Sequence, residues 1–185
     1  MKEFISDYIK SISGIIENLD IENLSKVIEY VKEAHRKEKR IFVFGNGGSA
    51  ATANHFACDF GKNAIKDDNN RFKIISLSNN ISSITACGND LGFETVFEEQ
   101  LKNLMQKEDL IICISASGNS PNIIKAVEFA IKRSGTIIGI TGFDGGKLKE
   151  ISDVNVNVVS DSYEKIEDIH LIITHIIVYW FKMNQ

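Results

Sequence analysis

A histidine and an aspartate four residues apart form the first pair in this sequence whose types and spacing suit chemistry. His55 and Asp59 lie in a stretch of helical pattern that begins near residue 49. Residues four apart share one face of a helix, so the pair can hold a metal ion or a reacting proton. The same spacing is common among plain surface contacts. The role of the pair therefore depends on what the sequence places around it.

The last helical stretch carries a second group of titratable side chains, Glu167, His170 and His175. A histidine among apolar residues is typically part of the core, and this is the interpretation we favour for His170. Glu167 and His175 share an approximate face, but eight residues separate them, about 12 Å along the axis. One helix would struggle to bring both to a single ion. A site that uses both would draw on another element or on a second subunit.

Two turns rich in glycine and serine suit the binding of a phosphate. The first, at residues 45–51, follows the apolar run 41–44 and precedes the helix that carries His55. Its glycines let backbone N–H groups approach an anion, and the helix N-terminus adds partial positive charge. His55 and Asp59 lie about two turns further along that helix. This distance suits a small phosphorylated substrate.

The second turn, at residues 115–121, follows the apolar run 110–114 and carries hydroxyls where the first has glycines. Any one of Ser115, Ser117 and Ser120, taken alone, is better explained as a helix cap. Three hydroxyls around a glycine at the end of a buried strand favour a ligand, because open α/β sheets bind ligands at the carboxyl ends of their strands. Asn89 and Asp90 are compatible with a turn or a helix cap as well as with a site.

The elements that position these residues follow from the apolar pattern. Short apolar runs separated mostly by helix-length segments predict an α/β fold, a three-layer α/β/α sandwich around a five-stranded parallel sheet. An N-terminal helical pair at residues 1–38 precedes an α/β core at 39–185, and together they make one domain. Surface loops are predicted at 66–70 and 141–146, and Pro121 suits the first turn of a helix. The expected strands lie at about 41–44, 73–77, 110–114, 136–140 and 154–159.

Composition excludes several classes of protein. The 185 residues are 43% hydrophobic and 25% charged, with a net charge of -4, which argues against a nucleic-acid partner. The basic cluster at 35–40 fits a solvated helix end. Three widely spaced cysteines and an acidic N-terminus favour a reducing cytoplasm over export. The longest apolar run, 169–181, is shorter than the ~20 residues of a membrane span.

Several segments spread over nearly the whole chain together form a specific pattern. They are the N-terminal helices and residues 45–50, 55–57, 88–90, 114–122, 141–148 and 169–175. In these segments the chain resembles the sugar isomerase (SIS) domain family, and within it the members that isomerise sedoheptulose 7-phosphate. The resemblance implies a homotetramer with sites between subunits and a sugar phosphate held by the serine turn. The substrate-binding residues that it implies are Asn46, Gly47, Gly48, Ser49, Asn89, Asp90, Ser115, Ala116, Ser117, Ser120 and Glu167.

The resemblance also implies an acid/base pair, Asp59 and His175, and a zinc ion. The chain departs from the family pattern at two of these positions, because Asp59 stands where glutamate is usual and Glu167 where glutamine is typical. The shorter aspartate requires the substrate to sit closer or else impairs proton transfer, whereas Glu167 adds a charge that favours a cation. The zinc ligands would be His55, Asp59, Glu167 and His175.

The resulting hypothesis is an aldose/ketose phosphate isomerase that works through an enediol, with zinc polarising the carbonyl group. The alternative is a non-catalytic SIS protein, either a sugar-phosphate sensor or an adaptor that binds a partner such as a replication initiator. The alternative needs the phosphate site but not the acid/base pair, so the presence of His175 argues against it.

Overall fold

Five parallel strands form the centre of the molecule in the computed structural model, which describes residues 1–64 and 71–184. The strand order is β2-β1-β3-β4-β5. All five strands begin and end within two residues of their predicted bounds, because each coincides with an apolar run. They are β1 (Arg40–Gly45), β2 (Lys73–Ser76), β3 (Leu110–Ser115), β4 (Thr136–Gly142) and β5 (Val154–Val158).

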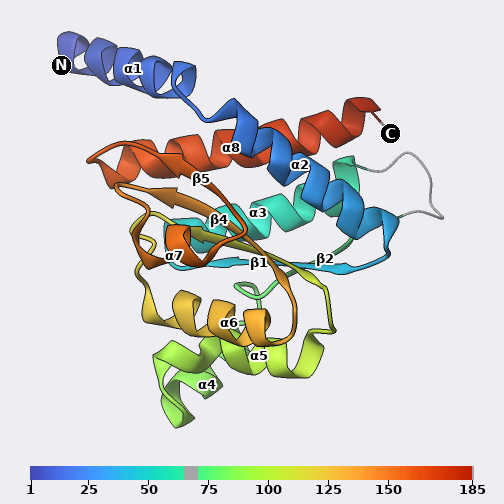
Figure 1. Cartoon of the computed structure of the whole chain (residues 1–185). Coiled ribbons are helices and arrows are strands. Elements are labelled where there is room, and N and C mark those ends of the chain that lie inside the picture. Colours follow the sequence, from blue (N-terminus) through green and yellow to red (C-terminus); the bar gives the residue numbers. More distant parts are fainter. Residues whose placement is uncertain (65–70, 185) are drawn as a thin grey trace.

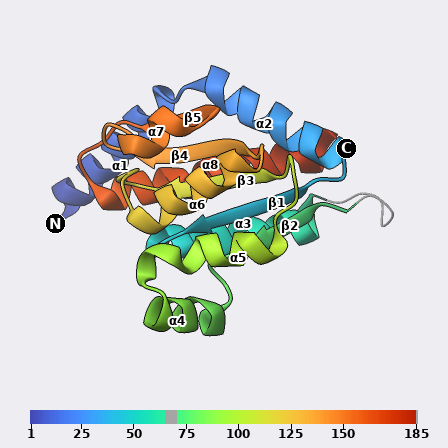
Figure 2. The same ribbon diagram turned by 60° about the horizontal axis from the view of Figure 1, so that its bottom comes forward.

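Helices cover both faces of the sheet, which confirms the predicted three-layer sandwich (Figures 1 and 2). One face, with Ile41 and Val43, packs under α2 (Ile21–Arg36), α3 (Gly48–Asn63) and α8 (Tyr163–Asn184). The other face, with Phe42 and Phe44, packs against α5 (Val96–Leu104), α6 (Pro121–Lys132) and α7 (Gly146–Ile151). Alternate residues of a strand point to opposite faces, so a continuous apolar run supplies both cores. Two further elements, α4 (Ile81–Asp90) and the short η1 (Phe93–Thr95), lie between β2 and α5 in the sequence.

The strand order places the two Gly/Ser turns side by side. After β1 the chain crosses to β2 on one side and then returns to β3 on the other side of β1. Gly45 and Ile114 are paired in register, so the turns that follow them start at the same level of the sheet. Ligands of open parallel sheets bind outside the carboxyl ends of the strands where the chain reverses direction in this way.

The two predicted N-terminal helices are present, but the first is largely exposed. α1 (Lys2–Glu17) extends away from α2 and has no buried residue (Figure 1). Ile12 and Ile15 pack against the core, whereas Phe4, Ile5 and Ile9 are exposed. The apolar stripe of α1 therefore has a partner within the chain along only part of its length.

Of the predicted turns and loops, the position of Pro121 is confirmed, whereas the segment 141–146 is more buried than expected. The expected loop at 66–70 lies outside the described residues, and Pro121 is the first residue of α6, as predicted. The segment 141–146 is less exposed than a surface loop, because β4 continues to Gly142 and Gly145 packs against Gly118. Among residues 1–64 and 71–184, no helix combines the length and apolar character needed to cross a membrane. All three cysteines are free thiols.

Candidate active site

A small cavity of about 170 Å³ lies where β1 and β3 end and α3 and α6 begin. We call it the serine pocket. Four serine side chains reach it from the two Gly/Ser turns, and Glu167 reaches it from α8. The residues that line it are Asn46, Ser49, Ile114, Ser115, Ala116, Ser117, Ser120, Tyr163 and Glu167.

The second turn folds tightly because its own hydroxyls satisfy its backbone. Ser115 Oγ accepts a hydrogen bond from Gly118 N–H at 3.2 Å, and Ser117 Oγ accepts one from Asn119 N–H at 3.3 Å. Gly118 has a φ of +63°, and a Cβ at this position would lie 1.9 Å from the carbonyl oxygen of Gly145. Only glycine fits there. Ser120 begins α6 without a side-chain capping bond, which leaves its hydroxyl for a ligand.

The first turn opens α3 at Gly47, whose φ is +55°. Ser78 holds the turn from the β2 side, because its hydroxyl contacts both the N–H and the carbonyl oxygen of Gly45, at 3.1 and 2.9 Å. The turn is also held from α6, where the side chains of Asn122 and Asn46 form two hydrogen bonds with each other. The N-termini of α3 and α6 therefore meet beside the serine pocket, and both add partial positive charge to it.

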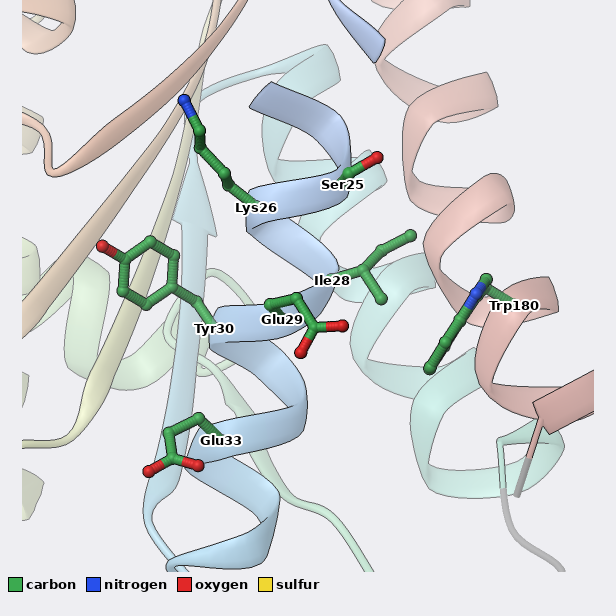
Figure 3. Close-up of a pocket in the computed structure, with 7 residues that line it drawn as sticks. All are labelled: Ser25, Lys26, Ile28, Glu29, Tyr30, Glu33 and Trp180. Carbon is green, nitrogen blue, oxygen red and sulfur yellow. The ribbon is translucent and has the colours of Figure 1, made fainter. Parts of the chain in front are cut away.

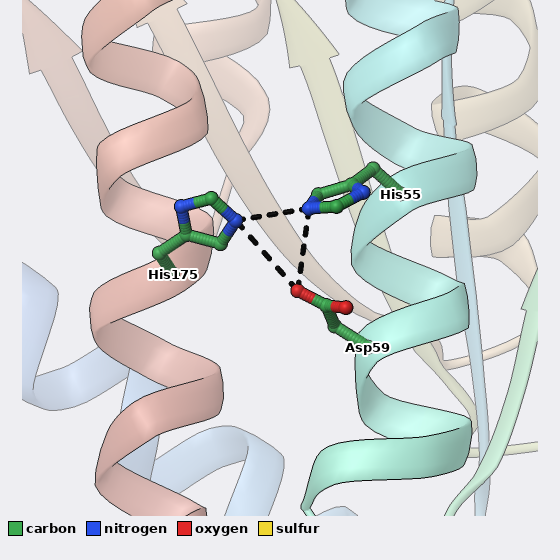
Figure 4. Close-up of side chains that lie close together, drawn as sticks. All are labelled: His55, Asp59 and His175. Carbon is green, nitrogen blue, oxygen red and sulfur yellow. Dashed lines mark hydrogen bonds and ion pairs between the residues drawn. The ribbon is translucent and has the colours of Figure 1, made fainter.

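The second cluster lies further along α3 and α8, and we call it the His/Asp cluster (Figure 4). His55 Nε2 and His175 Nε2 are 2.9 Å apart. Asp59 Oδ2 lies 3.3 Å from the first nitrogen and 3.6 Å from the second. The two histidine side chains are 48% and 50% exposed and Asp59 is 17% exposed, so the cluster opens to the surface. His55, Asp59 and His175 thus come together within one chain.

Glu167 lies apart from this cluster, so the chain brings together three of the four predicted metal ligands. Its carboxylate lies against Gly48 at the start of α3, where a Cβ on the glycine would be 2.2 Å from Oε2. His175 is eight residues further along α8, so about 12 Å of helix separates the two side chains. Glu167 belongs to the serine pocket, and α3 and α8 run side by side from this pocket to the His/Asp cluster.

The His/Asp cluster has a donor set that suits zinc. Two imidazole nitrogens and one carboxylate oxygen lie within 4.8 Å of one another. Zinc takes nitrogen and oxygen ligands, and catalytic zinc sites keep one position open beside three protein ligands. His55, Asp59 and His175 therefore fit such an ion.

Two of the predicted substrate residues lie apart from the serine pocket. Asn89 and Asp90 are the last residues of α4, and both are exposed. Asn89 Nδ2 donates to Asp90 Oδ1 at 2.7 Å. Neither residue lines the serine pocket of its own chain.

His170 is a core residue, as its apolar surroundings predict. It is fully buried between α8 and the sheet, and its Nε2 is 3.0 Å from the carbonyl oxygen of Thr141. Burial lowers the pKa of His170 to about 4, because the charged form would lose its hydration. The hydrogen bond fastens α8 to the end of β4, between the positions of Glu167 and His175.

Three residues that support the site escaped prediction from the sequence. Asn122 and Ser78 clasp the first turn, and Ser76 Oγ donates to Asn54 on α3 at 2.6 Å. Ser76 and Ser78 lie at the carboxyl end of β2, and Asn122 lies in the first turn of α6, positions where polar side chains near a site can be expected. Their partners lie on other strands or helices, so the contacts depend on the strand order.

Another cavity, of about 700 Å³, lies between α2 and the C-terminal part of α8 (Figure 3). Ile28 and Trp180 face it from the two helices, with Glu29 and Glu33 at its side. Ser25, Lys26 and Tyr30 also line it, but it includes no residue of either Gly/Ser turn and does not lie at the N-termini of α3 and α6.

Comparison with protein families places residues 3–142 in the SIS domain family. The chain is 38% identical over 177 residues to the phosphoheptose isomerase of Aliarcobacter butzleri, covering 96% of this chain and 92% of that protein. The solved structure of phosphoheptose isomerase GmhA from Neisseria gonorrhoeae matches with a TM-score of 0.90 at 30% identity, over 98% of both chains. A phosphoheptose isomerase from Francisella tularensis matches with a TM-score of 0.87 at 28% identity, again over 98% of both chains.

Proposed function

The chain belongs to the SIS domain family and, within it, to the phosphoheptose isomerases, and from this premise we propose that it interconverts sedoheptulose 7-phosphate and a heptose 7-phosphate through an enediol. The convergence of His55, Asp59 and His175 along the same two helices that border the serine pocket is the observation that carries this proposal. A sugar phosphate has one end to anchor and one end to react, and the two groups of residues suit these tasks.

The serine pocket binds the phosphate in this proposal. Ser115, Ser117 and Ser120 offer hydroxyls, and the N-termini of α3 and α6 offer backbone N–H groups. Asn46, Gly47 and Gly48 line the side toward the sugar, with Ser49, Ala116 and Glu167 beside them.

Asp59 and His175 form the acid/base pair. One of them takes the proton from the carbon beside the carbonyl group, and the other protonates the carbonyl oxygen. The electron pair of the broken C–H bond becomes the C=C bond of the enediol. A proton then returns to the neighbouring carbon while the hydroxyl on the first carbon loses its proton and becomes the new carbonyl group, which gives the isomer. The contacts of 2.9 to 3.6 Å among His55, Asp59 and His175 support this assignment, because proton transfer requires such proximity.

His55, Asp59 and His175 would also hold a zinc ion. When bound, zinc supplies polarisation of the carbonyl group. Glu167 adds a negative charge to the serine pocket, at the other end of the site.

We further propose that the active unit is a homotetramer. Asn89 and Asp90 lie outside the serine pocket of their own chain, and α1 leaves Phe4, Ile5 and Ile9 uncovered. A second copy that covers this helix and supplies Asn89 and Asp90 would complete the site. The whole chain acts as one SIS domain, and its free thiols fit a reducing cytoplasm.

The deciding experiment measures turnover of sedoheptulose 7-phosphate by the purified protein, after chelation and after readdition of zinc, together with the amount of metal bound. We expect turnover, with zinc binding lost when His55 is replaced by alanine. Binding without turnover across pentose, hexose and heptose phosphates would instead identify a sugar-phosphate sensor. Light scattering tests the tetramer.

A further inference from the structure

Asn46 and Asn122 form a reciprocal amide pair between the first turn and α6. Asn46 Nδ2 donates to Asn122 Oδ1 at 2.9 Å, and Asn122 Nδ2 donates to Asn46 Oδ1 at 2.9 Å. The residues are 76 positions apart, and each stands at the start of a helix that opens onto the serine pocket. The pair therefore ties together the two turns that form this pocket.

A third hydrogen bond fixes which way both amides face. Ile123 N–H donates to Asn122 Oδ1 at 3.0 Å. If the Asn122 amide were reversed, its NH₂ group would face this N–H donor and the bond would be lost. Because Asn122 is fixed, the reciprocal pair leaves Asn46 only one orientation.

The two partners differ in their access to a ligand. Asn122 is 2% exposed and does not line the serine pocket, whereas Asn46 does. In Asn46 the pair uses one of the two N–H groups and one of the two oxygen lone pairs. One donor and one acceptor of Asn46 therefore remain for a ligand, at positions set by Asn122.

We propose that Asn122 is a positioning residue that acts on sugar-phosphate binding entirely through Asn46. The proposal rests on the proposed function of the serine pocket. It adds that Asn122 orients Asn46, one of the residues that line this pocket. Asn122 holds the Asn46 amide in its binding orientation before the ligand arrives. Replacing Asn122 therefore weakens sugar-phosphate binding and leaves the acid/base step unaffected.

A double-mutant cycle tests this role, with the variants Asn122→Ala, Asn46→Ala and the combination. We expect Asn122→Ala to raise the KM and the Kd for sedoheptulose 7-phosphate about fivefold to tenfold, with kcat changed less than twofold. Once Asn46 is alanine, adding Asn122→Ala should change neither constant further. Asn122→Ser, which keeps a polar group in the buried position, should raise KM and Kd in the same direction, and it replaces Asn122→Ala if that variant does not fold.

Gln100→Ala is the matched control, because Gln100 is also a buried amide with two hydrogen bonds to backbone carbonyls, but it lies on α5. It should lower the melting temperature and leave KM unchanged. If Asn122→Ala lowers only the melting temperature, or raises KM equally in both backgrounds, the positioning role is wrong. The Kd for sedoheptulose 7-phosphate, measured by calorimetry, gives this answer even if the wild-type protein does not turn the sugar over, a result that would count only against the proposed function.

Discussion

The serine pocket and the His/Asp cluster lie along the same two helices but are built differently. Ser49 and Ser115 are buried, and the turns around them are held by hydrogen bonds from Ser78 and Asn122. In contrast, the side chains of His55 and His175 are about half exposed. The phosphate end is thus organised in advance within one chain, whereas the reacting end needs a sugar or a second copy to exclude water from it.

Replacing the reacting groups gives the largest expected effect and separates the two regions. Asp59→Asn and His175→Asn should each lower kcat by about 10²- to 10⁴-fold, because each removes one partner of the proton transfer. The Kd for inorganic phosphate, measured by calorimetry, should stay unchanged. Cys58→Ser, on α3 beside Asp59, is the control and should retain activity. Full turnover in both asparagine variants would place the chemistry elsewhere.

His170 connects the two regions, because it fastens α8 between Glu167 and His175. Its pKa is about 4 in the folded protein and about 6.5 when unfolded, so the unfolded state binds a proton that the folded state excludes. Stability is therefore full above pH 6.5 and falls as the pH drops toward 4, by about 3 kcal/mol at most. Urea unfolding at pH 7 and pH 4.5 measures the loss.

The control for this pH dependence is His170→Gln, which keeps a hydrogen-bond donor and has no charge to gain. It should lose less stability than the wild type between the two pH values. An equal loss in both proteins would assign the acid sensitivity to other groups, such as the carboxylates paired on the surface.

A substitution that distorts the serine pocket should weaken phosphate binding and leave the His/Asp cluster intact, the opposite of a substitution in the cluster. Gly118→Ala places a Cβ 1.9 Å from a backbone oxygen at a φ of +63°, so the second turn must move. We expect the Kd for inorganic phosphate to rise about tenfold or more, with zinc affinity at the His/Asp cluster retained. Gly61→Ala on α3, where a Cβ meets open space, is the matched control and should alter neither. Retained phosphate affinity in Gly118→Ala would contradict a role for this turn.

The sequence predicts the parts of this molecule that depend on local pattern. The strands coincide with short runs rich in apolar residues, with valine and asparagine alternating in β5, and helical spacing alone brings His55 and Asp59 to one face. Helix rise also separates Glu167 from His175. The pair of Asn46 and Asn122 could not be foreseen, because it exists only once β3 lies beside β1.

Exposure was harder to predict than secondary structure. The sequence predicts the helix α1 but not how far it is covered, and Ile5 and Ile9 are exposed. Gly145 is predicted to lie in a surface loop, but it is buried because it packs against Gly118. Both features depend on contacts between segments distant in sequence, which apolar periodicity does not specify.

The smallest expected effect tests the charge that distinguishes the serine pocket from an ordinary phosphate site. Among residues 1–64 and 71–184, Glu167 is the one charged residue that lines this pocket, and no lysine or arginine lines it. Its carboxylate repels a phosphate dianion, so Glu167→Gln should tighten inorganic phosphate about threefold to tenfold at low salt and less at high salt. Glu164→Gln removes the same charge one turn earlier on α8, outside the pocket, and should change little. Weaker binding in Glu167→Gln would mean that the carboxylate recruits a cation, and the phosphate end would then be incomplete within one chain, as the reacting end is.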